Sequence, residues 1–77
     1  MAKILFFGPL SDLLDIEALE VKLPAQVRTV SDLIAHLHER GPAWKRYLQA
    51  DKLQITRNRQ IGDANMAIVD SDEIAFI

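Results

Sequence analysis

The sequence contains no cysteine, which excludes a disulfide framework, a zinc–thiolate site and a thiol nucleophile. It has only three glycines, and Gly8, Gly41 and Gly62 are too far apart to form a phosphate-cradling loop. No apolar run approaches the length that spans a bilayer. The net charge of −2 and the scattered basic residues provide no basic face for nucleic acid. We therefore expect a cytoplasmic protein that binds neither a membrane nor nucleic acid.

The polar residues form no catalytic or metal-binding pattern. His36 and His38 are two residues apart in a predicted helix, so their side chains point in different directions and cannot share a metal ion. Asp70, Asp72 and Glu73 match no metal-ligand spacing and are typical of a solvated turn. We therefore expect no catalytic residue, no metal and no bound cofactor in this chain.

What the sequence does contain is enough apolar residues for one small core. Its 77 residues are near the lower size limit for an independent domain, and 49% of them are hydrophobic. No linker, repeat or low-complexity segment divides the chain. Residues 1–77 are therefore predicted to form a single domain, and a domain this small gains stability from a partner.

Several short segments have the composition or the alternation of strands. The predicted strands are residues 4–7, 19–23, 53–56, 60–61 and 73–77. The first two are expected to pair antiparallel. The first and last are apolar on both faces, which favours neighbouring positions at the centre of a sheet.

The main helix is predicted to begin after Thr29. Asp32 follows three residues later, which completes a capping box. An apolar stripe then follows at helical spacing, formed by Val30, Leu33, Ile34 and Leu37. Arg40 is placed in the last turn, where the helix dipole favours a cation, and Gly41 and Pro42 end the helix.

Two shorter helices are also predicted. Leu10, Leu13 and Leu14 have helical spacing, and Ser11 or Asp12 is the expected cap. A second short helix is predicted from the spacing of Trp44, Tyr47 and Leu48. With one main helix, the economical fold is an α+β β-grasp (ubiquitin-like) domain. In this fold a mixed four- or five-stranded sheet packs on the main helix, accompanied by the short helices.

The sheet face opposite the helix is predicted to carry an apolar patch. If Ile4 and Phe6 face the helix, the side chains that alternate with them point away from it. The predicted patch consists of Phe7, Ile61, Ile77, Leu5 and Ala75, with Ile61 at its margin. Because the only long helix covers the other face, we interpret this patch as a partner-binding surface.

Four segments in order resemble the ubiquitin-like sulfur-carrier family, and within it the small subunits of molybdopterin synthase. They are residues 3–7, Thr29-Val30, Asn58 in a turn, and residues 70–76. The resemblance covers essentially the whole chain. It implies a protein whose C-terminal glycine is adenylated with ATP by an E1-like partner enzyme and converted to a thiocarboxylate. Sulfur is then delivered for dithiolene formation in molybdenum cofactor biosynthesis.

The resemblance also implies the partners. They are the large subunit of molybdopterin synthase, in a heterotetramer of two small and two large subunits, and the adenylating enzyme. In this family Phe7, Ile61 and Ile77 correspond to positions of the partner-binding sheet face.

The family's closing strand leads into a flexible tail that ends in Gly-Gly, and this sequence contains no Gly-Gly pair. We expect such a tail after Ile77 in the natural protein. Two alternatives remain open from the sequence. One is a sulfur carrier for thiamin or tRNA thiolation. The other, if the chain ends at Ile77, is a ubiquitin-like interaction domain without transfer chemistry.

Overall fold

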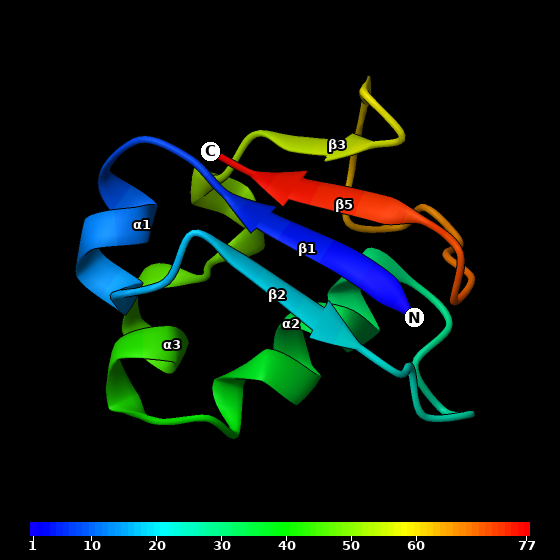
Figure 1. Cartoon of the computed structure of the whole chain (residues 1–77), viewed down its shortest axis with the longest axis horizontal. Helices are drawn as coiled ribbons and strands as arrows, with labels where there is room; N and C mark the ends of the chain where they lie inside the picture. Colours follow the sequence, from blue (N-terminus) through cyan, green and yellow to red (C-terminus); the bar gives the residue numbers. More distant parts are fainter.

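The two strands predicted for the centre of the sheet lie side by side there. The computed structural model describes residues 1–77, and Figure 1 shows the sheet with its helices. The strands are β1 (Ala2–Phe6), β2 (Ala18–Val21), β3 (Ile55–Arg57), β4 (Gln60–Gly62) and β5 (Glu73–Phe76). The helices are α1 (Pro9–Leu14), α2 (Val30–His38) and α3 (Pro42–Tyr47), with a 3₁₀ turn η1 (Ala50–Lys52).

The strand order is β2-β1-β5-β3-β4. β1 and β5 are parallel, whereas the other three neighbouring pairs are antiparallel. The sheet is therefore mixed, as predicted, and has five strands, the larger of the two predicted numbers. The chain reaches the end of β5 at the same end of the sheet as the β1–α1 connection (Figure 1).

The capping box at the start of α2 is confirmed. Asp32 N donates to Thr29 Oγ1 over 3.1 Å, and Thr29 N donates back to Asp32 Oδ2 over 3.2 Å. The predicted stripe is buried at all four of its positions. The placement of Arg40 is wrong, because the helix ends at His38 with Glu39 as its C-cap. The Arg40 guanidinium instead lies 4.7 Å from the centre of the Trp44 ring.

The core lies between the inner face of the sheet and the helices. Ile4, Ile74 and Phe76 are fully buried, and each large apolar side chain buried in this way contributes about 1.5–3 kcal/mol to folding. The Phe6 ring meets Trp44 of α3 edge-on, with 5.4 Å between ring centres. This contact positions α3 against the end of the sheet where β1 finishes.

Three further local predictions differ from the structure. The strand predicted for residues 53–56 is β3, which spans Ile55–Arg57, because Leu53 N donates to the Ala50 carbonyl and closes η1. Ser11 and Asp12 do not cap α1, because the N-cap is Gly8 and Ser11 Oγ donates to the Gly8 carbonyl from inside the first turn. The strand predicted for residues 19–23 ends at Val21. Leu23 N donates to the Asp70 carboxylate over 2.8 Å, and this side-chain contact takes the place of a strand pairing. The longest helix, α2, has nine residues, and none of the helices is long and apolar enough to cross a membrane.

Candidate protein-interaction surface

The strand register assembles one row of side chains across the outer face of the sheet. Leu5 pairs with Ala18 on one side and with Ala75 on the other. Ala75 pairs with Thr56, and Thr56 pairs with Ile61. Paired residues in neighbouring strands point to the same face, so all five belong to the face opposite α2.

A second apolar row lies at the end of the sheet where β1 and β5 finish. Phe7 N donates to the Phe76 carbonyl over 3.0 Å, which extends the β1–β5 pairing by one residue and brings Phe7 beside Ile77. The Phe7 side chain is 47% exposed, Ile77 is 50% exposed and Ile61 is 74% exposed. These three apolar side chains therefore present the free surface that the sequence predicted.

The remaining two residues of the predicted patch contribute less surface. Leu5 is half-buried, and Ala75 is only 6% exposed. Ala75 does lie on the outer face, because it is paired with Leu5 and Thr56 and takes no part in the core. A methyl group in the middle of a sheet is covered by the longer side chains of its neighbours. Ala75 therefore lies on the predicted face with little exposed surface, and its role as a partner-binding residue stays a prediction.

The other end of the same face is charged. Lys3 is paired with Glu20 on one side and with Glu73 on the other. Arg59 Nε lies 4.0 Å from Glu73 Oε1 in an exposed ion pair. The outer face thus has an apolar end at Phe7 and a polar rim at Lys3, a composition common in protein-binding surfaces.

The β3–β4 hairpin that carries Ile61 is fastened to β5 by Asn58. Asn58 and Arg59 form the two-residue turn, and both have positive φ, at 50° and 70°. Asn58 N donates to the Glu73 carbonyl over 2.7 Å, and Glu73 N donates to Asn58 Oδ1 over 2.9 Å. The Asn58 amide also donates to Asp72 Oδ1. These contacts hold Ile61 in register with the rest of the patch.

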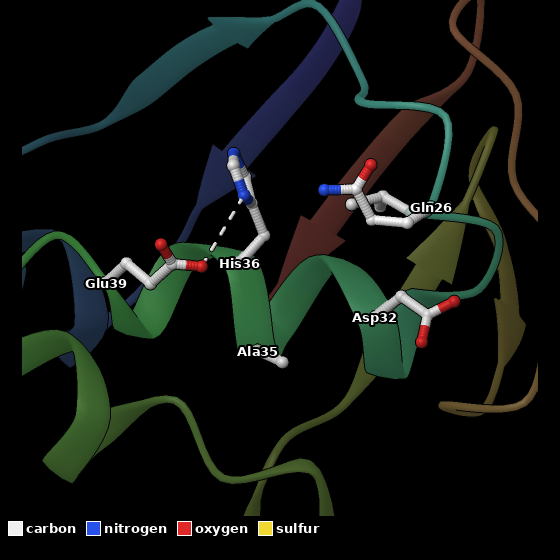
Figure 2. A pocket seen from close by; sticks show the side chains of 6 residues that line it. Gln26, Asp32, Ala35, His36 and Glu39 are labelled. Atoms are coloured by element: carbon white, nitrogen blue, oxygen red, sulfur yellow. Dashed lines mark ion pairs between the residues drawn. The ribbon is translucent and has the colours of Figure 1, made fainter.

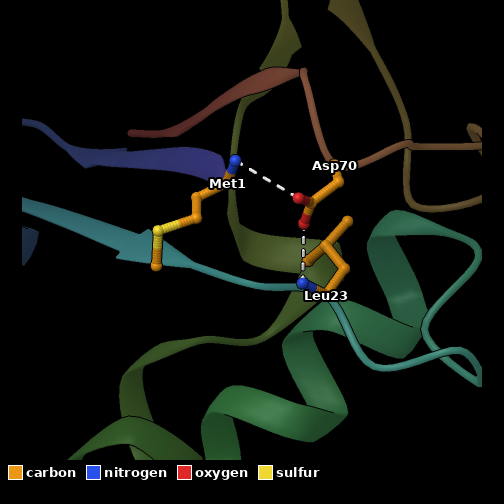
Figure 3. Close-up of polar contacts among 3 residues, drawn as sticks. All are labelled: Met1, Leu23 and Asp70. Atoms are coloured by element: carbon orange, nitrogen blue, oxygen red, sulfur yellow. Dashed lines mark hydrogen bonds and ion pairs between the residues drawn. The ribbon is translucent and has the colours of Figure 1, made fainter.

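The acidic residues before β5 have structural roles. Figure 3 shows the Asp70 carboxylate between the Met1 ammonium, at 3.2 Å, and the backbone nitrogen of Leu23, at 2.8 Å. The hydrogen bond from Leu23 and the ammonium of Met1 together hold the pKa of Asp70 below its usual value. Asp72 Oδ2 accepts from Val69 N over 2.8 Å. From the sequence, these acids are interpreted as a solvated turn. That interpretation does not include the contact by which Asp70 joins the N-terminus to the turn before β5.

A hollow of about 210 Å³ lies along the exposed side of α2, lined in part by Asp32, His36 and Glu39. Figure 2 shows His36 turned toward Glu39, with Nδ1 4.0 Å from Oε2, while Asp32 is directed away from both. Asp32 is committed to the capping box, and the hydrogen bond from Arg28 N is the main reason that its pKa is lowered. No group of three or more potential ligands is arranged to hold a metal ion.

The other histidine of α2, His38, is half-buried at the edge of the apolar stripe. Its Nε2 lies 2.6 Å from the carbonyl oxygen of Leu48, which follows α3. The two histidines are thus separated, as their spacing predicted, and His38 joins α2 to α3.

Sequence comparison identifies similar proteins along nearly the whole chain. The ThiS family profile matches residues 4–77. The chain is 32% identical over 76 residues to the molybdopterin synthase sulfur carrier subunit of Escherichia coli K12, covering 99% of this chain and 91% of that protein. The subunit of the same name from Haemophilus influenzae is 29% identical over the same shares of the two chains.

Solved structures share the fold. SAMP1 from Haloferax volcanii superimposes with a TM-score of 0.79 at 21% identity, over 99% of this chain and 91% of that one. A chain from the complex of subunits 1 and 2 of the molybdopterin-converting factor of Helicobacter pylori gives a TM-score of 0.67 at 23% identity, over 99% and 89%. These similarities confirm the predicted β-grasp, ubiquitin-like fold.

Proposed function

Because the chain belongs to the ThiS family, we propose that it is the sulfur-carrier subunit of a molybdopterin synthase. The observation that carries the proposal is the similarity to two curated subunits of that name across 99% of this chain. A carrier needs a rigid domain and a docking surface and has no need of a catalytic pocket of its own. The exposed side chains of Phe7, Ile61 and Ile77 on one sheet face are consistent with that role.

We propose that sulfur is carried as a thiocarboxylate on a C-terminal glycine. The glycyl carboxylate attacks the α-phosphorus of ATP and releases pyrophosphate, and a sulfide equivalent from a sulfur donor then displaces AMP. The chain's 77 residues contain no Gly-Gly pair, so this chemistry requires residues after Ile77. A tail there would leave the sheet beside Phe7, and glycines without Cβ would allow it to extend through a narrow channel.

The proposed partners use the apolar end of the outer face. The H. pylori complex of subunits 1 and 2 supports a large subunit as one partner. We further propose a heterotetramer with that subunit and a transient complex with an E1-like enzyme, which binds the ATP. Each large apolar side chain buried at such an interface would be worth about 1.5–3 kcal/mol before the costs of association.

The proposal is tested by mixing the chain with the large subunit from the same organism and measuring binding by calorimetry. Intact mass of the protein from its native host provides the second measurement. A Gly-Gly-ended extension, with a further gain for oxygen replaced by sulfur, is the expected result. Binding to an adenylating enzyme without binding to the large subunit would assign the chain to thiamin or tRNA thiolation instead. A native mass equal to that of a chain ending at Ile77 would contradict the proposed sulfur transfer.

A further inference from the structure

A hollow of about 430 Å³ opens on the outer face next to Phe7, a size typical of clefts that receive a ligand group. Its apolar lining comes from Leu5, Phe6, Phe7 and Ala18, and the remaining lining residues are Gly8, Ser11 and Glu17. Leu5 and Ala18 are register partners, so the hollow continues the apolar row of the proposed interface.

Two residues with little or no side chain keep this hollow open. Ala18 places only a methyl group opposite Leu5. Gly8 has φ +61°, a conformation in the left-handed half that favours glycine, and a Cβ added there would meet no atom within 4 Å. The β1–α1 turn therefore demands a residue without a side chain at the point where the cavity needs space.

The segment that contributes Glu17 and Ala18 to the hollow is acidic, and Glu17 is its one acid that lines the hollow. Between Leu10 and Val21 the chain has four carboxylates and no lysine or arginine, and these acids are Asp12, Asp15, Glu17 and Glu20. None of them takes part in an ion pair, although cations are available elsewhere on the molecule. Glu17 contacts the rest of the fold through its backbone carbonyl, which accepts from Phe6 N over 2.9 Å. Its side-chain carboxylate is exposed and free for a partner.

We propose that the hollow is an anchor pocket for the large subunit. It receives an apolar side chain of that partner, and Glu17 pairs with a lysine or arginine beside that side chain. The inference rests on the proposed function and deepens it, because it assigns Glu17 and Ala18 as determinants of partner choice. An apolar anchor in a pocket with a charged residue at its rim combines affinity with orientation.

The test compares three variants of the full chain for binding to the large subunit by calorimetry. Ala18→Trp fills the hollow, and Glu17→Lys reverses the charge at its rim. Glu20→Lys is the matched control, because it makes the same charge change two register pairs from Ala18, opposite Lys3 at the polar end of the same face. Thermal melting of each variant checks that the fold is intact.

We expect Ala18→Trp and Glu17→Lys each to weaken binding about tenfold or more, and Glu20→Lys to change it about twofold or less. The loss in Glu17→Lys is expected to be recovered when the paired cation of the large subunit is replaced by glutamate. If wild-type chain binds and both hollow variants bind as tightly as Glu20→Lys, the anchor pocket is overturned and the proposed function stands. If wild-type chain itself fails to bind, both proposals fail.

Discussion

At the scale of single residues, Arg59 in the β3–β4 turn has an unfavourable backbone conformation. Arg59 has φ 70°, a conformation that costs an L-residue with a side chain about 1–2 kcal/mol relative to the right-handed region. Two-residue turns of this kind prefer Asn-Gly, and the chain has Asn at the first position and Arg at the second. The Arg59 side chain is 90% exposed and its 4.0 Å ion pair with Glu73 offsets little of this cost.

Replacing Arg59 with glycine is therefore expected to stabilise the protein by about 0.5–1 kcal/mol. Urea unfolding measures the free energy of unfolding directly. Arg59→Ala is the control, because it removes the same ion pair and retains a Cβ in the left-handed region, and it is expected to give no gain. A glycine variant no more stable than Arg59→Ala would contradict the relief of backbone strain at this position.

At the scale of elements, α2 depends on its capping box, because nine residues form a short helix. Thr29→Ala removes the acceptor for Asp32 N and is expected to cost about 1 kcal/mol of unfolding free energy. Ser31→Ala, two residues along the chain and exposed, is the control and is expected to change stability by less than about 0.5 kcal/mol. Equal losses in the two variants, measured by thermal and urea unfolding, would contradict a specific role for the cap.

The elements also show how far local sequence pattern can predict this fold. The start of α2 was predictable, because the cap and the stripe are contacts within a few residues. Its end at His38 was not, because Arg40 leaves the helix to lie over Trp44. The residues of the outer face could be predicted from the alternation of side chains along each strand. The burial of Ala75 could not, because it depends on which strands lie on either side of β5. The hollow beside Phe7 arises where β1, β2 and α1 meet, which no local pattern encodes.

At the scale of the whole molecule, two carboxylates are expected to make stability depend on pH: Asp70, which contacts the distant Met1 and Leu23, and Asp32, in the capping box of α2. The pKa of Asp70 and that of Asp32 both lie below the ordinary value of 3.8 in the folded protein, mainly through hydrogen bonds from Leu23 and Arg28. A lowered folded pKa gives stability that is present above the unfolded value and is lost as pH falls through the folded value. Acid is therefore expected to destabilise the fold progressively as the pH falls through the ordinary aspartate value of 3.8 and below it.

The melting temperature of wild-type protein is accordingly expected to fall between pH 7 and pH 3. Asp70→Asn should melt lower than wild type at pH 7 and should show a smaller difference between the two pH values, because its contact with Met1 and Leu23 no longer titrates. Asp51→Asn replaces an exposed carboxylate for which the structure shows no hydrogen bond or ion pair, and should retain the wild-type difference. If Asp70→Asn shows the same change in melting temperature between pH 7 and pH 3 as wild type, Asp70 does not contribute to the loss of stability in acid.

A substitution at Phe7 tests whether the proposed interface can be disrupted without unfolding the domain. Phe7 is 47% exposed, and Leu13 on α1, which is not one of the patch residues, is 44% exposed. Phe7→Glu and Leu13→Glu therefore place the same charge at similarly exposed apolar positions. Both variants are expected to melt near wild type, because neither residue belongs to the buried core.

Only Phe7→Glu is expected to lose affinity for the large subunit, by about tenfold or more, since it puts an unpaired charge in the centre of the proposed interface. Calorimetric titration of both variants against the same preparation of large subunit measures the difference. Equal binding by the two would mean that the sheet face is not the docking surface. A loss in Leu13→Glu alone would move the interface to α1.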